Sequence, residues 1–278
     1  MIKKLTLIIL AVIMTVIPLN AYANEGEEAP IIAEETVTEA ASEEPQTNGE
    51  WKLKKHYFYY YENGEAAKGL TKIGNRTYYF DKNGRQHTGW QKIGKSYYFF
   101  NIANGENGYM LTDKKVNKIY LNKSGKAKAT SANKKRLKTL VYATKLVEAA
   151  TKPDMKKRVK LRKCYDYILK NYKYRGSLKF NHTKNWEEDY AYFMYTKKHG
   201  SCYHFGATFA FAANACGYKK CYAVSSGGHG WAQVDGKVTD VSWENVDRKN
   251  HYFHFDINLS AHNGRPNYKQ YGRYKKRI

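Results

Sequence analysis

Cysteine is scarce in this chain, and the spacing of its few copies argues against a metal site. The 278 residues include four cysteines, at positions 164, 202, 216 and 221, and no pair has the C-x-x-C spacing. A structural zinc site needs paired ligands at short, fixed spacing, and the nine histidines are scattered. We therefore expect no metal and no cofactor. If Cys202 is a free nucleophile, at most one disulfide remains, between Cys216 and Cys221 or between Cys164 and either of them.

Long apolar runs are also missing, apart from one near the N-terminus. Residues 5–19, LTLIILAVIMTVIPL, form a run of 15 residues, whereas a membrane-spanning helix needs about 20. Two lysines precede this run, and AYA at 21–23 has the small-x-small pattern of a cleavage site. Residues 1–23 are therefore predicted to be a signal peptide. The mature protein should be secreted and have no transmembrane anchor.

Basic residues are absent from residues 24–50, which hold nine glutamates. Such a segment buries little surface and repels itself, so we expect an acidic, disordered linker. Removing residues 1–50 leaves 46 basic residues (48 − 2) and 16 acidic residues (25 − 9), a formal charge of +30 for residues 51–278. A field of that strength attracts anionic polymers, or it serves only as a solubilising surface. For an exported protein, anionic cell-surface polymers are the expected partners, and no nucleic-acid-binding motif is recognisable.

Aromatic residues, by contrast, are abundant and recur in a repeat. GLTKIGNRTYYFDKNGRQHT (69–88) aligns with GWQKIGKSYYFFNIANGENGYMLT (89–112), and residues 51–68 and 115–130 are weaker copies. The Asn-Gly pairs beside the aromatic clusters lie 20 and 21 residues apart, and Asn-Gly favours a tight hairpin turn. One hairpin cannot bury its aromatic face, but stacked hairpins can. Residues 51–130 are therefore predicted to form an all-β solenoid of hairpins.

The repeat resembles the cell-wall-binding repeats of Gram-positive surface proteins, of the choline-binding and glucan-binding type. In that family, ligands lie between adjacent hairpins, where aromatic faces hold a quaternary ammonium by cation–π attraction or stack on sugar rings. The resemblance implies wall polymers (teichoic acid, choline or glucan) as partners. The candidate ligand-binding residues are Trp90, Tyr97, Tyr98, Tyr78, Tyr79 and Met110. The alternative is that these aromatic side chains only pack neighbouring hairpins together.

From residue 131 the pattern becomes helical, with amphipathic stripes in 137–147, 153–172 and 185–200. The next stretch, GSCYHFGATFAFAANACGY (200–218), reads as a buried helix that begins at Cys202. A helix N-terminus favours an anion, which raises the thiolate fraction of a cysteine placed there. Cys202 is therefore a candidate nucleophile, although a small buried cysteine is the alternative.

A hairpin after this helix holds the side chains that a nucleophile would need. Residues 229–234 and 237–243 read as strands joined by an Asp-Gly turn. A two-residue turn places Trp231 opposite Asp240, and His229, two residues from Trp231, points to the same face. His229 and Asp240 are then diagonal neighbours within reach of a side-chain hydrogen bond. A helix bearing Cys202 against that face would complete a Cys–His–Asp set.

These stretches resemble the transglutaminase-like superfamily, which has a papain-like α+β core. By position, Cys202 matches the nucleophile, His229 the base and Asp240 the orienting acid. The resemblance implies that residues 131–278 form a transglutaminase-like cysteine catalytic domain. The backbone N–H of Cys202 is expected to be one oxyanion donor, and Trp186 is a candidate for a second. Residues 244–278 match no motif.

Together these features predict a secreted, cell-wall-associated cysteine enzyme that forms a thioester with a protein or peptide substrate at a peptide or glutamine amide. Water as the acyl acceptor makes it a peptidase or amidase, which we favour because bacterial members of the superfamily are often hydrolytic. A lysine amine as the acceptor makes it a cross-linking transglutaminase. A catalytically inactive wall-binding protein is the remaining alternative, and the intact triad argues against it.

Overall fold

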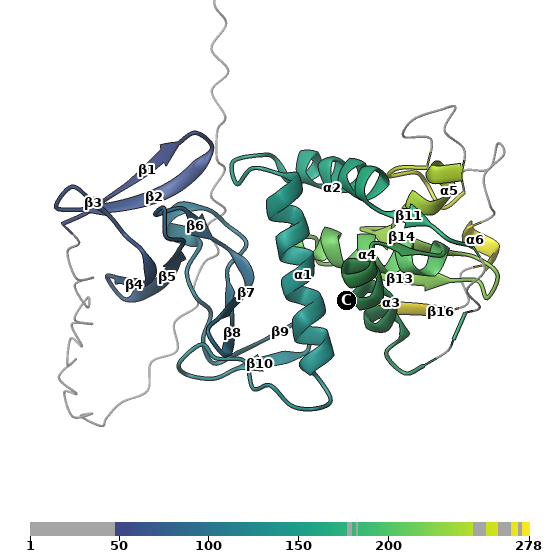
Figure 1. Cartoon of the computed structure of the whole chain (residues 1–278), viewed down its shortest axis with the longest axis horizontal. Coiled ribbons are helices and arrows are strands. Elements are labelled where there is room, and N and C mark those ends of the chain that lie inside the picture. Colours follow the sequence, from purple (N-terminus) through teal and green to yellow (C-terminus); the bar gives the residue numbers. More distant parts are fainter. Residues whose placement is uncertain (1–47, 177–179, 182, 247–253, 261–267, 272–273) are drawn as a thin grey trace, which may run out of the picture. The chain divides into compact units, whose positions relative to one another are not determined.

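The computed structural model describes residues 48–176, 180–181, 183–246, 254–260, 268–271 and 274–278. The expected signal peptide and all of the acidic linker before residue 48 lie outside these residues. Figure 1 labels the elements, whose bounds are β1 Glu50–Lys54, β2 Tyr57–Glu62, β3 Glu65–Ala66, β4 Gly69–Ile73, β5 Arg76–Phe80, β6 Gln86–His87, β7 Gly89–Ile93, β8 Ser96–Phe100, β9 Lys114–Val116, β10 Ile119–Leu121, α1 Lys134–Ala150, α2 Lys157–Asn171, β11 Lys173–Tyr174, α3 Trp186–Lys197, β12 His199–Gly200, α4 Cys202–Ala215, β13 Cys221–Ser225, β14 Gly230–Val234, β15 Lys237–Thr239, α5 Val241–Val246, α6 Tyr268–Tyr271 and β16 Tyr274–Arg277.

The first ten strands are successive antiparallel hairpins, as the repeat predicts. β1 pairs with β2, β4 with β5, β7 with β8 and β9 with β10. The hairpins lie in separate small sheets of two or three strands, and a backbone hydrogen bond from Met110 to Thr77 joins neighbouring repeats. The rings that pack between the first two hairpins are those of Trp51, Tyr60, Tyr78 and Phe80. Aromatic side chains here take the place of a larger core.

The second part of the chain is an α+β arrangement around α4. The four-stranded antiparallel sheet has the order β15-β14-β13-β16, and α4 packs on its two central strands. α1 and α3 cover the other side of α4. The helix can be surrounded because nearly every residue of α4 is apolar or small, and residues 202–213 are all buried.

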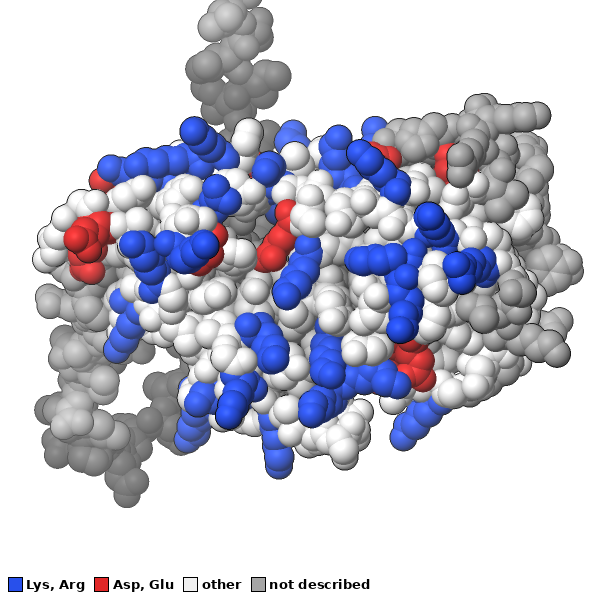
Figure 2. Space-filling view, viewed as in Figure 1, with Lys and Arg blue, Asp and Glu red and all other residues white. Residues whose placement is uncertain are grey.

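One hydrophobic core joins the two parts. Trp90, Tyr97 and Phe99 of the third hairpin belong to the same buried cluster as Leu137 and Leu140 of α1. α1 therefore packs on β7 and on α4. Figure 2 shows Lys and Arg side chains spread over the visible face of the described residues, with few acidic side chains among them. Among the described residues, no helix combines the length and the apolar character needed to cross a bilayer.

Two expected elements, one strand and one helix, have different bounds in the structure. The expected strand 237–243 ends at Thr239, and the chain then enters α5 at Val241. The expected helix beginning at Pro153 begins at Lys157 instead. The strand ends early because Asp240 accepts the N–H of Trp243 at the start of α5, in the manner of a helix cap.

Candidate active site

The N-terminus of α4 is held by a histidine three residues into the helix. Ser201 precedes the helix, and its backbone N–H donates to Nδ1 of His204 over 3.2 Å. Burial, and then the charge of His199, lower the pKa of His204 to about 4, so the imidazole is the neutral acceptor that this bond requires. The contact fixes the turn that carries Cys202, whose residue surface is 6% exposed.

Two glycines allow α4 to approach the sheet closely. A Cβ at Gly206 would lie 2.6 Å from the backbone carbonyl carbon of Trp231 in β14. A Cβ at Gly230 would lie 2.8 Å from Cα of Tyr203. Distances this short leave no room for any side chain, so the helix and the strand touch through their backbones. This contact brings the first turn of α4 against the residue before β14, which is His229.

The hairpin turns as the sequence predicts. Asp235 and Gly236 both have positive φ, 46° and 86°, which a two-residue turn requires. The register pairs Ala232 with Thr239 and so places Trp231 level with Asp240. Nε2 of His229 lies 2.5 Å from Oδ2 of Asp240. Nδ1 of the ring is thereby left for the thiol, and the structure brings Cys202, His229 and Asp240 together.

Asp240 is fully buried and accepts four hydrogen bonds. Its Oδ1 accepts the Ser242 hydroxyl over 2.8 Å and the Trp243 N–H over 3.1 Å. Its Oδ2 accepts the hydroxyl of Tyr268 over 3.0 Å besides the bond to His229. Tyr268 lies in the C-terminal stretch that matched no motif, so the sequence carried no signal of its role.

The pKa of His229 is set by its two neighbours. Burial alone would lower this pKa, but the charge and hydrogen bond of Asp240, followed by the hydrogen bond and charge of Cys202, raise it to about 10. The same pair acts on the carboxylate: burial would raise the pKa of Asp240, yet the charge of His229 and three hydrogen bonds hold it below its ordinary value. The imidazole therefore carries its second proton through the neutral range.

Aromatic side chains surround the three residues. Trp243 is 37% exposed and sets its ring edge-on to His229, 5.2 Å between centroids. Tyr174 pairs with Gly200 just before α4, and its pKa is raised by burial and then by the nearby Cys202. Trp186, the candidate oxyanion donor, is buried at the start of α3 against Phe180, 5.1 Å between centroids. Its role stays a prediction.

The other cysteines are buried thiols. Sγ of Cys164 lies 3.7 Å from Sγ of Cys216, and Cys221 is also free. The hydrogen bond with Cys216 and burial raise the pKa of Cys164 well above its ordinary value, and burial raises that of Cys221. A raised pKa makes Cys164 and Cys221 poor nucleophiles, whereas Cys202 lies beside His229.

The candidate ligand residues of the repeats do not gather in one cage. Trp90, Tyr97 and Tyr98 are buried, and the first two belong to the core shared with α1. Tyr78 is buried in the separate cluster of the first two hairpins, and its hydroxyl donates to the carbonyl of Glu106. Tyr79 stacks on Phe100, and Met110 forms a β-bridge with Phe100.

Two models of known families match parts of this chain. Residues 67–114 match the choline-binding repeat, and residues 144–257 match the transglutaminase-like superfamily. The second match spans Cys202, His229 and Asp240. Among curated proteins, none matches the chain at a comparable level of significance.

Several solved structures are similar to part of this chain, and they include choline-binding proteins of Streptococcus pneumoniae. Choline binding protein F from Streptococcus pneumoniae is 32% identical over 28% of this chain and 27% of its own, with a TM-score of 0.25. The multimodular pneumococcal cell wall endolysin from phage Cp-1, solved with choline, is 29% identical over 32% of this chain and 27% of its own, with a TM-score of 0.28. This chain thus spans about a quarter of the length of either protein.

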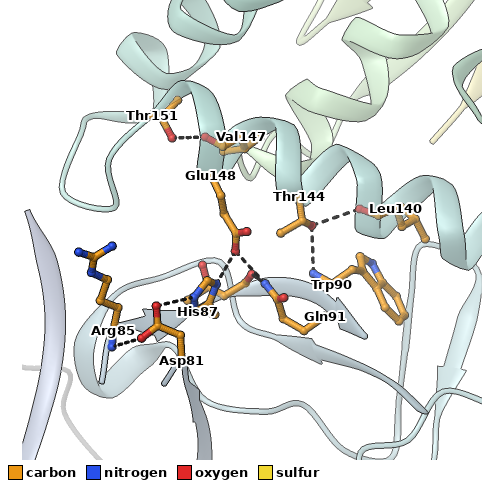
Figure 3. Close-up of polar contacts among 11 residues, drawn as sticks. Asp81, Arg85, His87, Trp90, Gln91, Leu140, Thr144, Val147, Glu148 and Thr151 are labelled. Carbon is orange, nitrogen blue, oxygen red and sulfur yellow. Dashed lines mark hydrogen bonds and ion pairs between the residues drawn. The ribbon is translucent and has the colours of Figure 1, made fainter. Parts of the chain in front are cut away.

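Polar contacts fasten the choline-binding repeats to the first helix of the second part (Figure 3). Oε1 of Glu148 in α1 lies 2.8 Å from Nδ1 of His87 and accepts the side-chain amide of Gln91 over 2.9 Å. Oγ1 of Thr144 accepts the backbone N–H of Trp90 over 3.2 Å. The third hairpin, β7–β8, and β6 before it therefore support α1, so the hairpins and the helical part of the chain pack together directly.

Proposed function

We propose that this protein is a secreted, cell-wall-associated cysteine enzyme that cleaves peptide or glutamine amides through a thioester acyl-enzyme, with water as the acceptor. The observation that carries the proposal is the buried His229–Asp240 pair beside Cys202 at the N-terminus of α4. A buried carboxylate with four hydrogen bonds keeps the imidazole in one orientation, which general acid–base catalysis requires.

In this mechanism the sulfur of Cys202 attacks the amide carbonyl carbon, and the tetrahedral oxyanion forms beside the backbone N–H of Cys202 at the start of the helix. Nδ1–H of His229 protonates the leaving nitrogen as the C–N bond breaks, which yields a thioester and a free amine or ammonia. The now neutral imidazole removes a proton from water, the hydroxide adds to the thioester, and the sulfur leaves as the carboxylic acid is released. Asp240 holds Nε2 throughout.

In this proposal the repeats determine where the enzyme is located. Choline-binding repeats are typical of proteins at the wall of Gram-positive bacteria, and we propose that those in residues 51–130 stack as a hairpin solenoid that keeps the enzyme among wall polymers. Because the third hairpin packs on α1, the catalytic domain would be held at the wall by a rigid contact. A substrate displayed on the wall, such as a peptide, would then meet Cys202 at high local concentration.

The test uses a thiol-reactive acylating probe and two classes of acceptor. Wild type and Cys202→Ala are treated with the probe, and Cys221→Ala serves as the matched control because it removes a buried thiol of the same domain. Labelling should occur at Cys202 alone, survive in the control and fall by more than about 100-fold in His229→Ala.

Amide substrates in ¹⁸O-labelled water then separate the reactions. Incorporation of ¹⁸O into the new carboxylate is expected for the peptidase or amidase. Incorporation of an added primary amine instead would make the enzyme a cross-linking transglutaminase. Unlabelled Cys202 under all conditions would mean that the domain is a scaffold, and the proposal would be wrong.

A further inference from the structure

A basic groove runs along the face where β9 and β10 meet the C-terminal end of α4. One hollow of about 790 Å³ lies between residues 114–118 and the segment after α4. A second, of about 560 Å³, lies between that segment, the β14–β15 turn and β16. Gly217 and Lys219 line both hollows, so they form one continuous depression, called here the lysine groove.

The charge of the lysine groove is almost entirely of one sign. Eight cationic residues line it: Lys114, Lys115, Lys118, Lys157, Lys219, Lys220, Lys275 and Arg277. The single acidic lining residue is Asp235. In the part of the chain that the structure describes, none of the eight forms an ion pair with a carboxylate. Like charges gathered in this way repel one another, and a bound anion would relieve the repulsion.

The contacts that these cations do make hold them in place without neutralising them. Nζ of Lys118 donates to the carbonyl of Arg277 over 2.8 Å, and Nη2 of Arg277 donates to the carbonyl of Lys219 over 3.1 Å. Nζ of Lys275 lies 4.1 Å above the ring of Tyr222. Burial lowers the pKa of Lys118, and the charge of Arg136 lowers it further. The ammonium group of Lys118 is thus partly desolvated and has no carboxylate partner among the described residues.

The aromatic faces of the repeats are, by contrast, already covered by cations of the chain. Three tyrosine rings each lie under one: Arg85 is 4.6 Å from the centre of Tyr57, Lys54 is 4.2 Å from Tyr61, and Arg76 is 4.6 Å from Tyr109. A quaternary ammonium would have to displace these side chains before it could use the rings. An anion at the lysine groove would meet no such obstacle.

We propose that the lysine groove binds a linear phosphodiester polymer of the cell wall through its phosphate groups. The groove takes its cations from both parts of the chain, β9 and its turn on one side and the α4–β13 segment with β16 on the other. Open hollows lined by separate ammonium groups suit a series of spaced phosphates better than one small anion. The groove lies outside the Cys202 site, so the proposal holds whether or not the enzyme reaction does.

The experiment measures binding of the whole protein to a fluorescent poly(glycerol phosphate) free of choline, over a range of salt concentrations. The groove variant is Lys115→Glu/Lys219→Glu, and the control Lys134→Glu/Lys163→Glu changes the net charge equally at exposed lysines elsewhere. The groove variant should lose about 10-fold or more in affinity and show a shallower dependence on salt, because fewer counterions are released, while the control stays within about twofold.

Equal weakening in both variants would overturn the proposal, because binding would then follow net charge alone. Duplex DNA with the same number of phosphates is the second probe, and tighter binding of DNA than of the wall polymer would also overturn it. Thermal unfolding and probe labelling of Cys202 confirm that both variants are folded, so a loss of binding cannot be mistaken for a loss of structure.

Discussion

His229 turns Nε2 toward Oδ2 of Asp240, at 2.5 Å, and this leaves Nδ1 for the sulfur of Cys202. The imidazole keeps this orientation because Asp240 is buried and accepts hydrogen bonds from Ser242, Trp243 and Tyr268. An imidazole held in this way can pass a proton between the sulfur and a leaving group without rotating.

The pH dependence of the site follows from that pair. The pKa of His229 is raised to about 10, so the stabilisation it contributes is complete below its unfolded value of about 6.5 and is lost as pH rises through 10. In Asp240→Asn the pKa of His229 should fall, and the basic limb of kcat/KM should move more than one pH unit toward neutrality, with kcat reduced about 10³-fold or more. A pH profile of both proteins checks this, and an unmoved limb would contradict it.

Tyr268 is expected to be a positioning residue. Tyr268→Phe removes one hydrogen bond from Oδ2 of Asp240 and keeps the buried ring, which packs on Trp231 with 5.1 Å between centroids. We expect kcat to fall about 10- to 100-fold, with KM little changed, because a hydrogen bond to a charged group contributes about 1.5–3 kcal/mol. Steady-state kinetics of Tyr268→Phe beside Tyr120→Phe, a change at an exposed ring of the repeats, provides the comparison.

The contact between α4 and β14 should not tolerate a methyl group. Alanine normally favours a helix over glycine by about 1 kcal/mol, yet in Gly206→Ala the new Cβ meets the backbone of Trp231. We expect a lower Tm and slower labelling of Cys202, because the nucleophile is pushed away from His229. Gly228→Ala, where the space is open, should leave Tm nearly unchanged. Equal Tm values for the two variants would contradict this prediction.

His204 should make the domain acid-sensitive. Its pKa of about 4 lies below the ordinary value near 6.5, so the folded state disfavours the proton, and stability is lost as pH falls from 6.5 through 4. In His204→Gln this contribution to the pH dependence should disappear. Urea unfolding at pH 7 and pH 5 measures it: wild type should lose more stability than the variant between the two.

At the contact between the repeats and α1, the group that titrates is His87. Burial would lower the pKa of His87, but the hydrogen bond and charge of Glu148, with Asp81, raise it. Glu148→Gln keeps the shape and removes the charge, so this pKa should fall and the junction should open more often at neutral pH. Hydrogen exchange in residues 89–93 should then quicken, while exchange in β13 stays unchanged. Unaltered exchange at both places would show that the apolar contacts alone hold the junction.

Several features could be read from the sequence because they are local. The Asp-Gly turn fixes the hairpin register within two residues, and this alone makes neighbours of His229 and Asp240. The aromatic repeat with Asn-Gly turns predicted hairpins, and β1 to β10 confirm them. The run of small and apolar residues after Gly200 predicted a buried helix beginning at Cys202, which is where α4 begins.

Other features depend on contacts between distant parts of the chain. Trp90 reads as a ligand-binding residue within its repeat, but α1 covers it and its ring nitrogen donates to Asn117. Tyr268 reaches Asp240 across 28 residues, and the lysine groove combines segments from β9 to β16. Spacing along the chain decides short-range geometry, whereas burial and charge clustering arise only when remote elements pack. The sequence by itself therefore determined the hairpins, the helix that begins at Cys202 and the pairing of His229 with Asp240. The tertiary structure decided which aromatic faces are covered and where the cations gather.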